Sequence, residues 1–160
     1  MKRIKFISYT LLLMVFMTAF MSCDEKGDPQ GPVVLNDEQT ASVAMRGKWG
    51  QATNPDLPFG TTEGVLDDLI IDFRIGDDYY PTDFAASGAD YFFGTDGSGT
   101  WSWEDGAFTI ISLANVAPIT TIQVIKKASQ IRVTFIYEGD DGGRVSGLGE
   151  YSVTLKKIAP

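Results

Sequence analysis

The chain has 160 residues, 13 Lys and Arg against 21 Asp and Glu, one cysteine and no histidine, for a formal net charge of −8. This acidic balance excludes a nucleic-acid surface, which needs clustered Lys and Arg. The lack of histidine excludes His-dependent triads and Cys/His zinc sites, so we expect neither an enzyme nor a metal or other cofactor.

Residues 1–22 are predicted to be a secretory signal peptide. A basic start precedes an apolar run over residues 7–20, which is too short and wrongly flanked for a transmembrane span. The run ends at the only cysteine, Cys23, and this arrangement resembles the lipobox of bacterial lipoproteins. The resemblance implies that Cys23 becomes the acylated N-terminus. The alternative is an ordinary signal peptide with a chance cysteine at its end.

Residues 23–42 are predicted to be an acylated N-terminus followed by a flexible tether, because the segment is polar with two prolines and two glycines. Residues 24–28, Asp-Glu-Lys-Gly-Asp, resemble the signal that exports lipoproteins of some Gram-negative bacteria to the outer face of the outer membrane. Solvation of the tether is the alternative. Cleavage of the predicted signal peptide, residues 1–22, would remove three bases and no acids. The mature chain would then have ten bases against 21 acids and a net charge of −11.

Residues 43–160 are expected to form one domain, since nearly 120 residues suffice for one core. The first predicted strand covers residues 44–51, and the prolines of residues 52–65 indicate a loop. Residues 66–75 alternate between apolar and polar side chains and predict a strand. A second long loop is expected over residues 76–88, with a helical turn from Thr82.

A three-stranded meander is predicted over residues 89–113. Its strands are expected around residues 91–93, 100–103 and 108–111, which are rich in aromatic and β-branched residues. Asp-Gly turns at residues 96–97 and 105–106 would reverse the chain.

Three more strands are predicted, a hairpin of residues 119–127 and 130–138 about Ala128-Ser129 and a last strand over residues 149–158. Eight antiparallel strands in sequence favour an all-β, up-and-down barrel, with a β-sandwich as the alternative. The inward positions are mostly large, which favours a filled interior with at most a shallow pocket. They are Leu69, Ile71, Phe73, Ile131, Val133, Phe135, Tyr137, Tyr151, Val153 and Leu155.

Gly47-Lys48-Trp49 matches the Gly-x-Trp signature that opens lipocalin and other calycin barrels, and residues 93–103 are similar to the mid-domain of small lipocalin-like bacterial lipoproteins. The resemblance implies a calycin-type barrel in which Trp49 closes one end, often under an arginine of the last strand. Here that strand offers only Lys156 and Lys157. The Thr-Asp-Tyr signature and the C-terminal helix are absent, so the resemblance implies the barrel more than a classical carrier.

Several pairs of acidic residues are adjacent in the sequence. They lie at predicted turns and strand ends, where their carboxylates are expected to be solvated rather than catalytic. One such pair, Asp140-Asp141, lacks the spacing of a calcium loop.

The aromatic residues are the remaining candidates for a site. Tyr79, Tyr80 and Phe84 lie in a predicted loop, and Trp101 and Trp103 share one face of a strand. These rings either pack as core and lid or line a ligand mouth.

Two function classes therefore stay open. The first is a non-catalytic surface or periplasmic lipoprotein, held to the outer membrane by its lipid, that binds a small hydrophobic molecule or a glycan. The second is a structural or inhibitory module that presents a filled barrel to a protein partner.

Overall fold

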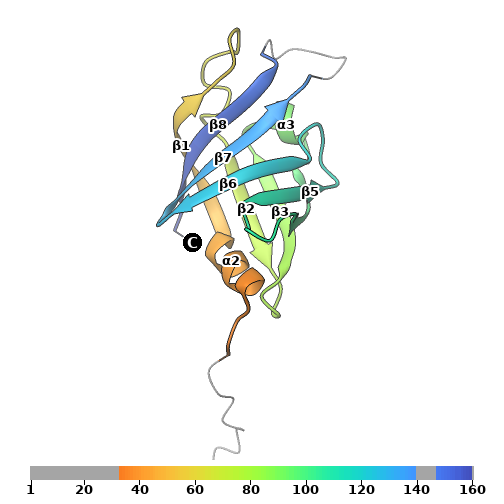
Figure 1. The fold of residues 1–160 in the computed structure, drawn as a ribbon. Helices are drawn as coiled ribbons and strands as arrows, with labels where there is room; N and C mark the ends of the chain where they lie inside the picture. Colours follow the sequence, from red (N-terminus) through yellow and green to blue (C-terminus); the bar gives the residue numbers. More distant parts are fainter. Residues whose placement is uncertain (1–32, 140–146, 160) are drawn as a thin grey trace, which may run out of the picture. The chain divides into compact units, whose positions relative to one another are not determined.

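A computed structural model of the protein describes residues 33–139 and 147–159. The chain divides into two units, Met1–Val34 and Leu35–Pro160. The second is a closed antiparallel barrel whose eight strands follow one another in sequence order (Figure 1). The predicted up-and-down barrel is confirmed, and the sandwich alternative is excluded. The predicted signal peptide and Cys23 lie outside the described residues.

The strands of the barrel are β1 (Gly47–Asp56), β2 (Ile70–Ile75), β3 (Pro81–Ser87), β4 (Ser98–Trp103), β5 (Ile110–Ala114), β6 (Thr121–Lys127), β7 (Gln130–Tyr137) and β8 (Gly149–Lys157). Two helices accompany them in the described residues, α2 (Asp37–Met45) and α3 (Asp90–Phe93). The predicted hairpins about Asp105-Gly106 and Ala128-Ser129 are present, because β4 pairs with β5 and β6 pairs with β7. The predicted hairpin about Asp96-Gly97 is not, because its first strand is a helix.

The prediction for residues 76–93 is wrong in two places. The expected loop contains β3, and the expected strand at residues 91–93 is the helix α3. Phe84 of β3 pairs with Phe73 on one side and with Gly99 on the other. These two ladders override the weak strand preference of the Ala-rich sequence around Phe84, because strand propensity depends mainly on cross-strand packing.

Helix α2 covers residues that the sequence assigned to the tether and to the first strand. Its start is a capping box, in which the Asn36 side chain accepts from the Gln39 N–H and the Gln39 side chain accepts from the Asn36 N–H. Ser42 and Met45 are buried. The helix therefore packs against the barrel although its sequence shows no apolar stripe.

Strand β1 extends further than predicted, to Asp56. Its pairing with β2 covers Gly47 to Trp49, whereas its pairing with β8 continues through two register shifts. Gln51 and Asn54 have positive φ angles there, as expected for bulges. Pro55 is tolerated because a strand paired on one side needs fewer backbone donors. Strand β2 is shorter than predicted, because it begins at Ile70. The residues expected to open it form turns instead, and Leu66 and Leu69 are buried there.

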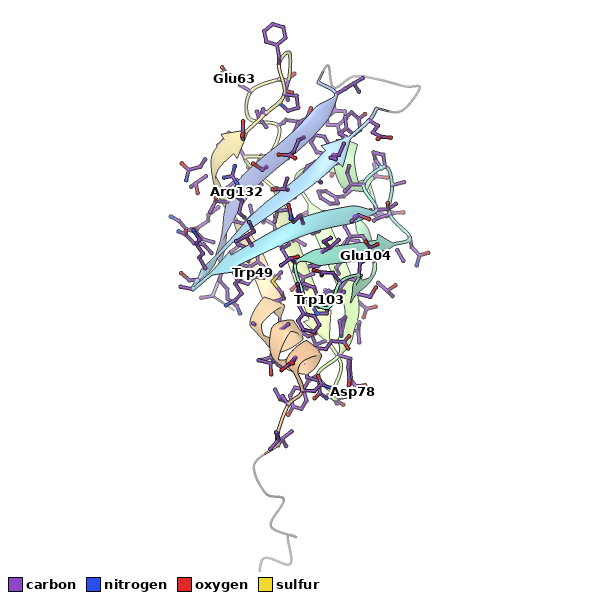
Figure 2. All side chains as sticks on the ribbon, viewed as in Figure 1. Trp49, Glu63, Asp78, Trp103, Glu104 and Arg132 are labelled. Carbon is purple, nitrogen blue, oxygen red and sulfur yellow. The ribbon has the colours of Figure 1, made fainter. Side chains whose placement is uncertain are left out.

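All ten positions predicted to point inward are buried, so the prediction of a packed interior is confirmed at those positions. Two aromatic groups occupy opposite ends of the barrel. Trp49 and Trp103 lie at the end that carries α2 (Figure 2), and the Trp101 ring packs against Trp103 there. At the other end Phe92 of α3 packs on Phe135 and Tyr151, with ring centroids 5.0 and 4.8 Å away.

Candidate functional site

Trp49 is fully buried at the α2 end of the barrel. Its Nε1–H donates to the backbone oxygen of Met45 at 2.7 Å, which ties the indole to the last turn of α2. A base of the last strand does lie over the ring: Lys157 Nζ is 5.1 Å from the ring centroid. Burial lowers the pKa of Lys157, and the charges of Lys126 and Arg46 lower it further.

Trp101 and Trp103, two of the predicted ligand contacts, lie together at this end with ring centroids 5.5 Å apart. Trp101 is buried and its Nε1–H donates to the Arg74 backbone oxygen at 2.7 Å. Trp103 is half-buried and its Nε1–H donates to Ser42 Oγ at 3.0 Å. Both indoles have polar partners within the fold, so they anchor β2 and α2 to β4.

The other three predicted ligand contacts are placed differently. Phe84 is buried on β3. The Tyr80 hydroxyl accepts a hydrogen bond of 2.8 Å from Asn36 Nδ2 and so connects the β2–β3 turn to the start of α2. Tyr79 lies in that turn with a φ of 66°. The ligand mouth stays a prediction, but Phe84 and Tyr80 act here as core and anchoring side chains.

A pocket forms where β6 and β7 separate. Their ladder runs from Lys127 opposite Gln130 to Gln123 opposite Thr134. Beyond Thr134, β7 goes on pairing with β8 as far as Tyr137. The chain before β6 is drawn away from β7 by two hydrogen bonds, from Leu113 N–H to the Thr120 oxygen at 2.7 Å and from Ile119 N–H to the Phe92 oxygen at 3.0 Å. The two strands therefore diverge.

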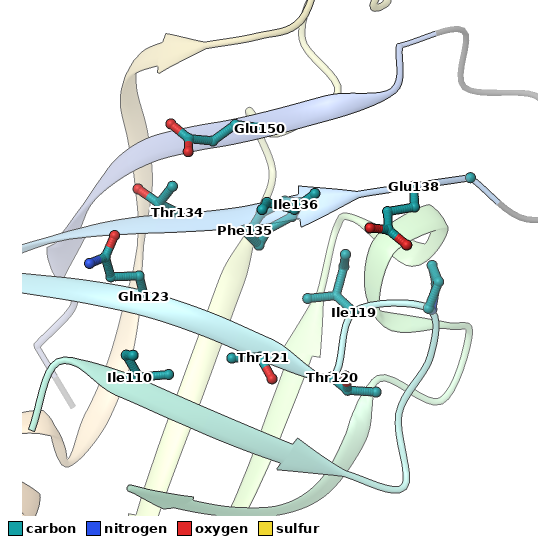
Figure 3. Close-up of a pocket in the computed structure, with 12 residues that line it drawn as sticks. Ile110, Ile119, Thr120, Thr121, Gln123, Thr134, Phe135, Ile136, Glu138 and Glu150 are labelled. Atoms are coloured by element: carbon teal, nitrogen blue, oxygen red, sulfur yellow. The ribbon is translucent and has the colours of Figure 1, made fainter. Parts of the chain in front are cut away.

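The space between them is a pocket of about 460 Å³, which we call the wedge pocket (Figure 3). Its apolar lining includes Ile110, Pro118, Ile119, Phe135 and Ile136. Its polar lining includes Thr120, Thr121, Gln123, Thr134, Glu138 and Glu150. This volume lies within the usual range of about 300–1,000 Å³ for small-molecule sites, which combine apolar walls with a few polar groups.

Sequence reasoning missed the wedge pocket because several of its lining side chains look like ordinary outward residues of regular strands, and Phe135 looks like an ordinary inward one. Thr121, Gln123 and Ile136 all sit at exposed strand positions. The only sequence signal was a large apolar side chain at an outward position of β7, Ile136, which is 62% exposed. Single exposed hydrophobic residues are common on protein surfaces and predict little by themselves.

One acidic side chain, Asp105, is fixed by hydrogen bonds within its own turn. The carboxylate of Asp105 accepts from the N–H groups of Thr109 and Ile110 and from the Thr109 hydroxyl. The Ile110 N–H is the main cause that holds the pKa of Asp105 below its ordinary value. Within residues 33–139 and 147–159, no group of three acidic, Cys or His side chains is placed to hold a metal ion. The pair Asp140-Asp141 lies outside the described residues.

The fold and the pocket together define a small closed β-barrel with a packed interior and a hollow on its side. No protein-family model, curated protein or solved structure matches the chain. The resemblance to lipocalin-like lipoproteins therefore stays a prediction that rests on Gly47, Trp49 and the residues around the Asp-Gly turns. In the part of the chain that the structure describes, no helix is long and apolar enough to span a membrane.

Proposed function

We propose that this protein is a non-catalytic, lipid-anchored lipoprotein of the outer membrane that binds a small hydrophobic molecule in the wedge pocket. The observation that carries the proposal is the pocket itself, about 460 Å³ with isoleucine walls and a polar rim. It lies on the side of the barrel, since Thr121, Gln123 and Ile136 line it from exposed strand positions.

The pocket favours a hydrophobic ligand over a glycan. Sugars bind proteins best on flat, exposed aromatic faces. Phe135 is the aromatic residue of the pocket lining, and it is almost completely buried. Trp101 is buried as well, and the Trp103 ring packs between Trp101 and Phe108. The apolar surface on offer is therefore aliphatic, which suits an alkyl chain or an alicyclic body.

The second candidate function, a protein-interaction module, is favoured by a different observation. Phe59 in the loop after β1 is fully exposed, and Leu148 just before β8 is 65% exposed. The two loops approach each other, because a Cβ on Gly149 would lie 3.5 Å from Pro58. Exposed apolar side chains on neighbouring segments of this kind are candidates for an interaction surface.

The lipid anchor gives the first testable prediction. Cells fed a fatty-acid analogue are expected to label the wild-type protein, and Cys23→Ala is expected to abolish the label, because Cys23 is the only thiol of the chain. The measurement is in-gel detection of the analogue, with an antibody against the protein to confirm expression. A Cys23→Ala protein that still takes up label would overturn the proposed anchor.

The ligand site gives the second prediction. Thr121→Trp is expected to fill the wedge pocket and weaken binding of the neutral apolar probe N-phenylnaphthylamine by about tenfold or more, which corresponds to about 1.4 kcal/mol. Thr121 is exposed, so the larger side chain is expected to change the free energy of unfolding little. Fluorescence titration of the exported protein in lipid nanodiscs measures the affinity, with empty nanodiscs subtracted.

Ile125→Trp is the matched control, because Ile125 lies on the same strand and the same outward face but does not line the wedge pocket. Its affinity for the probe is expected to stay within about twofold of wild type. Equal affinities in wild type, Thr121→Trp and Ile125→Trp would show that the probe binds elsewhere and would contradict the proposed site. Native mass spectrometry of protein purified from its source would then test for a bound protein partner instead.

A further inference from the structure

The wedge pocket carries negative charge on one side only. Glu138 follows the end of β7, and Glu150 lies on β8 opposite Ile136. Both line the pocket from its β7–β8 side (Figure 3). Among residues 33–139 and 147–159, neither carboxylate has a hydrogen bond or ion pair, and no Lys or Arg lines the pocket.

The bases of the same three strands gather at the opposite end. Lys126 and Lys127 end β6 at the hairpin, and Gln130 beside them pairs with Lys156 of β8. Arg132 lies next along β7, where its guanidinium donates to Ser152 Oγ. The strands β6 to β8 are therefore basic at the hairpin end and acidic at the pocket. Within residues 33–139 and 147–159, no Lys or Arg forms an ion pair with Glu138 or Glu150.

The remaining polar groups of the pocket are suited to accept hydrogen bonds. Thr121 and Thr134 contribute hydroxyl oxygens and Gln123 an amide oxygen. A protonated amine has three N–H donors and no acceptor, so carboxylates, hydroxyls and an amide oxygen form a suitable set of partners. A carboxylate or phosphate head group would instead face two like charges, which disfavours binding.

We infer that the wedge pocket selects a cationic amphiphile, with a protonated amine at Glu138 and Glu150 and an aliphatic body against Ile110, Ile119 and Ile136. This inference rests on the proposed function, because it names the ligand class of the same pocket. Both carboxylates are exposed, so they are expected to increase the affinity for a cationic ligand only moderately. At low salt we expect the amine to bind about three- to tenfold more tightly than a neutral analogue. Salt should reduce it, because the Debye length falls from about 10 Å at 0.1 M to about 3 Å at 1 M.

The test uses hexylamine, hexanol and hexanoate, which share one alkyl chain and differ in charge. Each competes against N-phenylnaphthylamine on the full exported protein in nanodiscs, at low and at high salt. Hexylamine is expected to bind most tightly and hexanoate least. The double variant Glu138→Gln, Glu150→Gln is expected to bring hexylamine and hexanol within about twofold of each other.

Glu63→Gln with Glu104→Gln is the matched control, since both residues are exposed, lie outside the pocket lining and change the net charge equally (Figure 2). It is expected to keep the wild-type preference for hexylamine. If all three compounds bind alike and the Glu138/Glu150 variant changes nothing, the inferred cation preference is wrong while the pocket stands. If none displaces the probe and Thr121→Trp has no effect, the proposed function fails as well.

Discussion

Trp49→Ala is expected to lower the free energy of unfolding by about 3–5 kcal/mol, the usual range for truncating a buried large aromatic side chain. Trp49 is fully buried where β1 meets β2 and β8. Its loss would also leave the Met45 backbone oxygen without its indole donor. Lys157 would lose the ring over which its ammonium lies. The losses of packing, of the hydrogen bond and of the cation–π contact therefore all lower the free energy of unfolding.

Chemical denaturation followed by circular dichroism measures the loss, because the remaining tryptophans complicate a fluorescence signal. Trp49→Phe is the control: it keeps much of the apolar volume and removes the Nε1–H, so an intermediate loss is expected. A loss below about 1 kcal/mol for Trp49→Ala, the size of an ordinary surface substitution, would mean that Trp49 does not close this end of the barrel.

Phe92→Ala is expected to cost a similar amount, about 3–5 kcal/mol. Phe92 is buried and its ring lies 4.8 to 5.3 Å, between centroids, from those of Tyr151, Phe135 and Tyr137. Aromatic pairs of this geometry add about 0.5–1.5 kcal/mol each beyond the area they bury. Truncating Phe92 opens a cavity within this cluster at the end of the barrel away from α2.

Tyr91→Ala is the matched control, because Tyr91 belongs to the same short helix but is 54% exposed. Its expected effect is within about 0.5 kcal/mol. Phe92→Ala keeps the backbone oxygen that accepts from Ile119 N–H, but the loss of the ring frees α3 to shift and to move Ile119 of the pocket lining with it. We therefore expect weaker probe binding in the wedge pocket for Phe92→Ala and unchanged binding for Tyr91→Ala. Equal destabilisation by the two substitutions would show that α3 does not plug the barrel.

The sequence by itself determined that the domain is all-β and built of antiparallel strands, and it favoured a barrel over a sandwich; closure of the barrel was decided by the tertiary structure. In β7 and β8 the alternation of apolar and polar residues specifies which face is buried, since a slip of one residue would expose the whole apolar set. The turns at Asp105-Gly106 and Ala128-Ser129 specify which strands are neighbours. Ten large inward residues then predict a packed interior, and each of them is buried.

Only the tertiary structure decided where β3 and α3 lie. Residues 81–87 contain one large apolar side chain, Phe84, and form a strand because β2 and β4 pair with them from both sides. Residues 91–93 are three successive aromatics, which local preference assigns to a strand. They form a helical turn because Phe92 and Phe93 can then both reach the core. Strand propensity differs by about 1 kcal/mol or less per residue. Burying one Phe side chain contributes about 1.5–3 kcal/mol, so the burial of Phe92 and Phe93 overrides it.

The wedge pocket depends on tertiary structure even more strongly. Its position is set where the β6–β7 ladder stops, and the hydrogen bond between Ile119 N–H and the Phe92 oxygen is one cause of that stop. These residues are 27 positions apart in the chain. The amino-acid types of Ile119 and Phe92 do not predict that their backbones form a hydrogen bond with each other. Side-chain patterns along a strand report which face is buried, but the end of a ladder is decided by competing backbone partners that only the folded chain brings together.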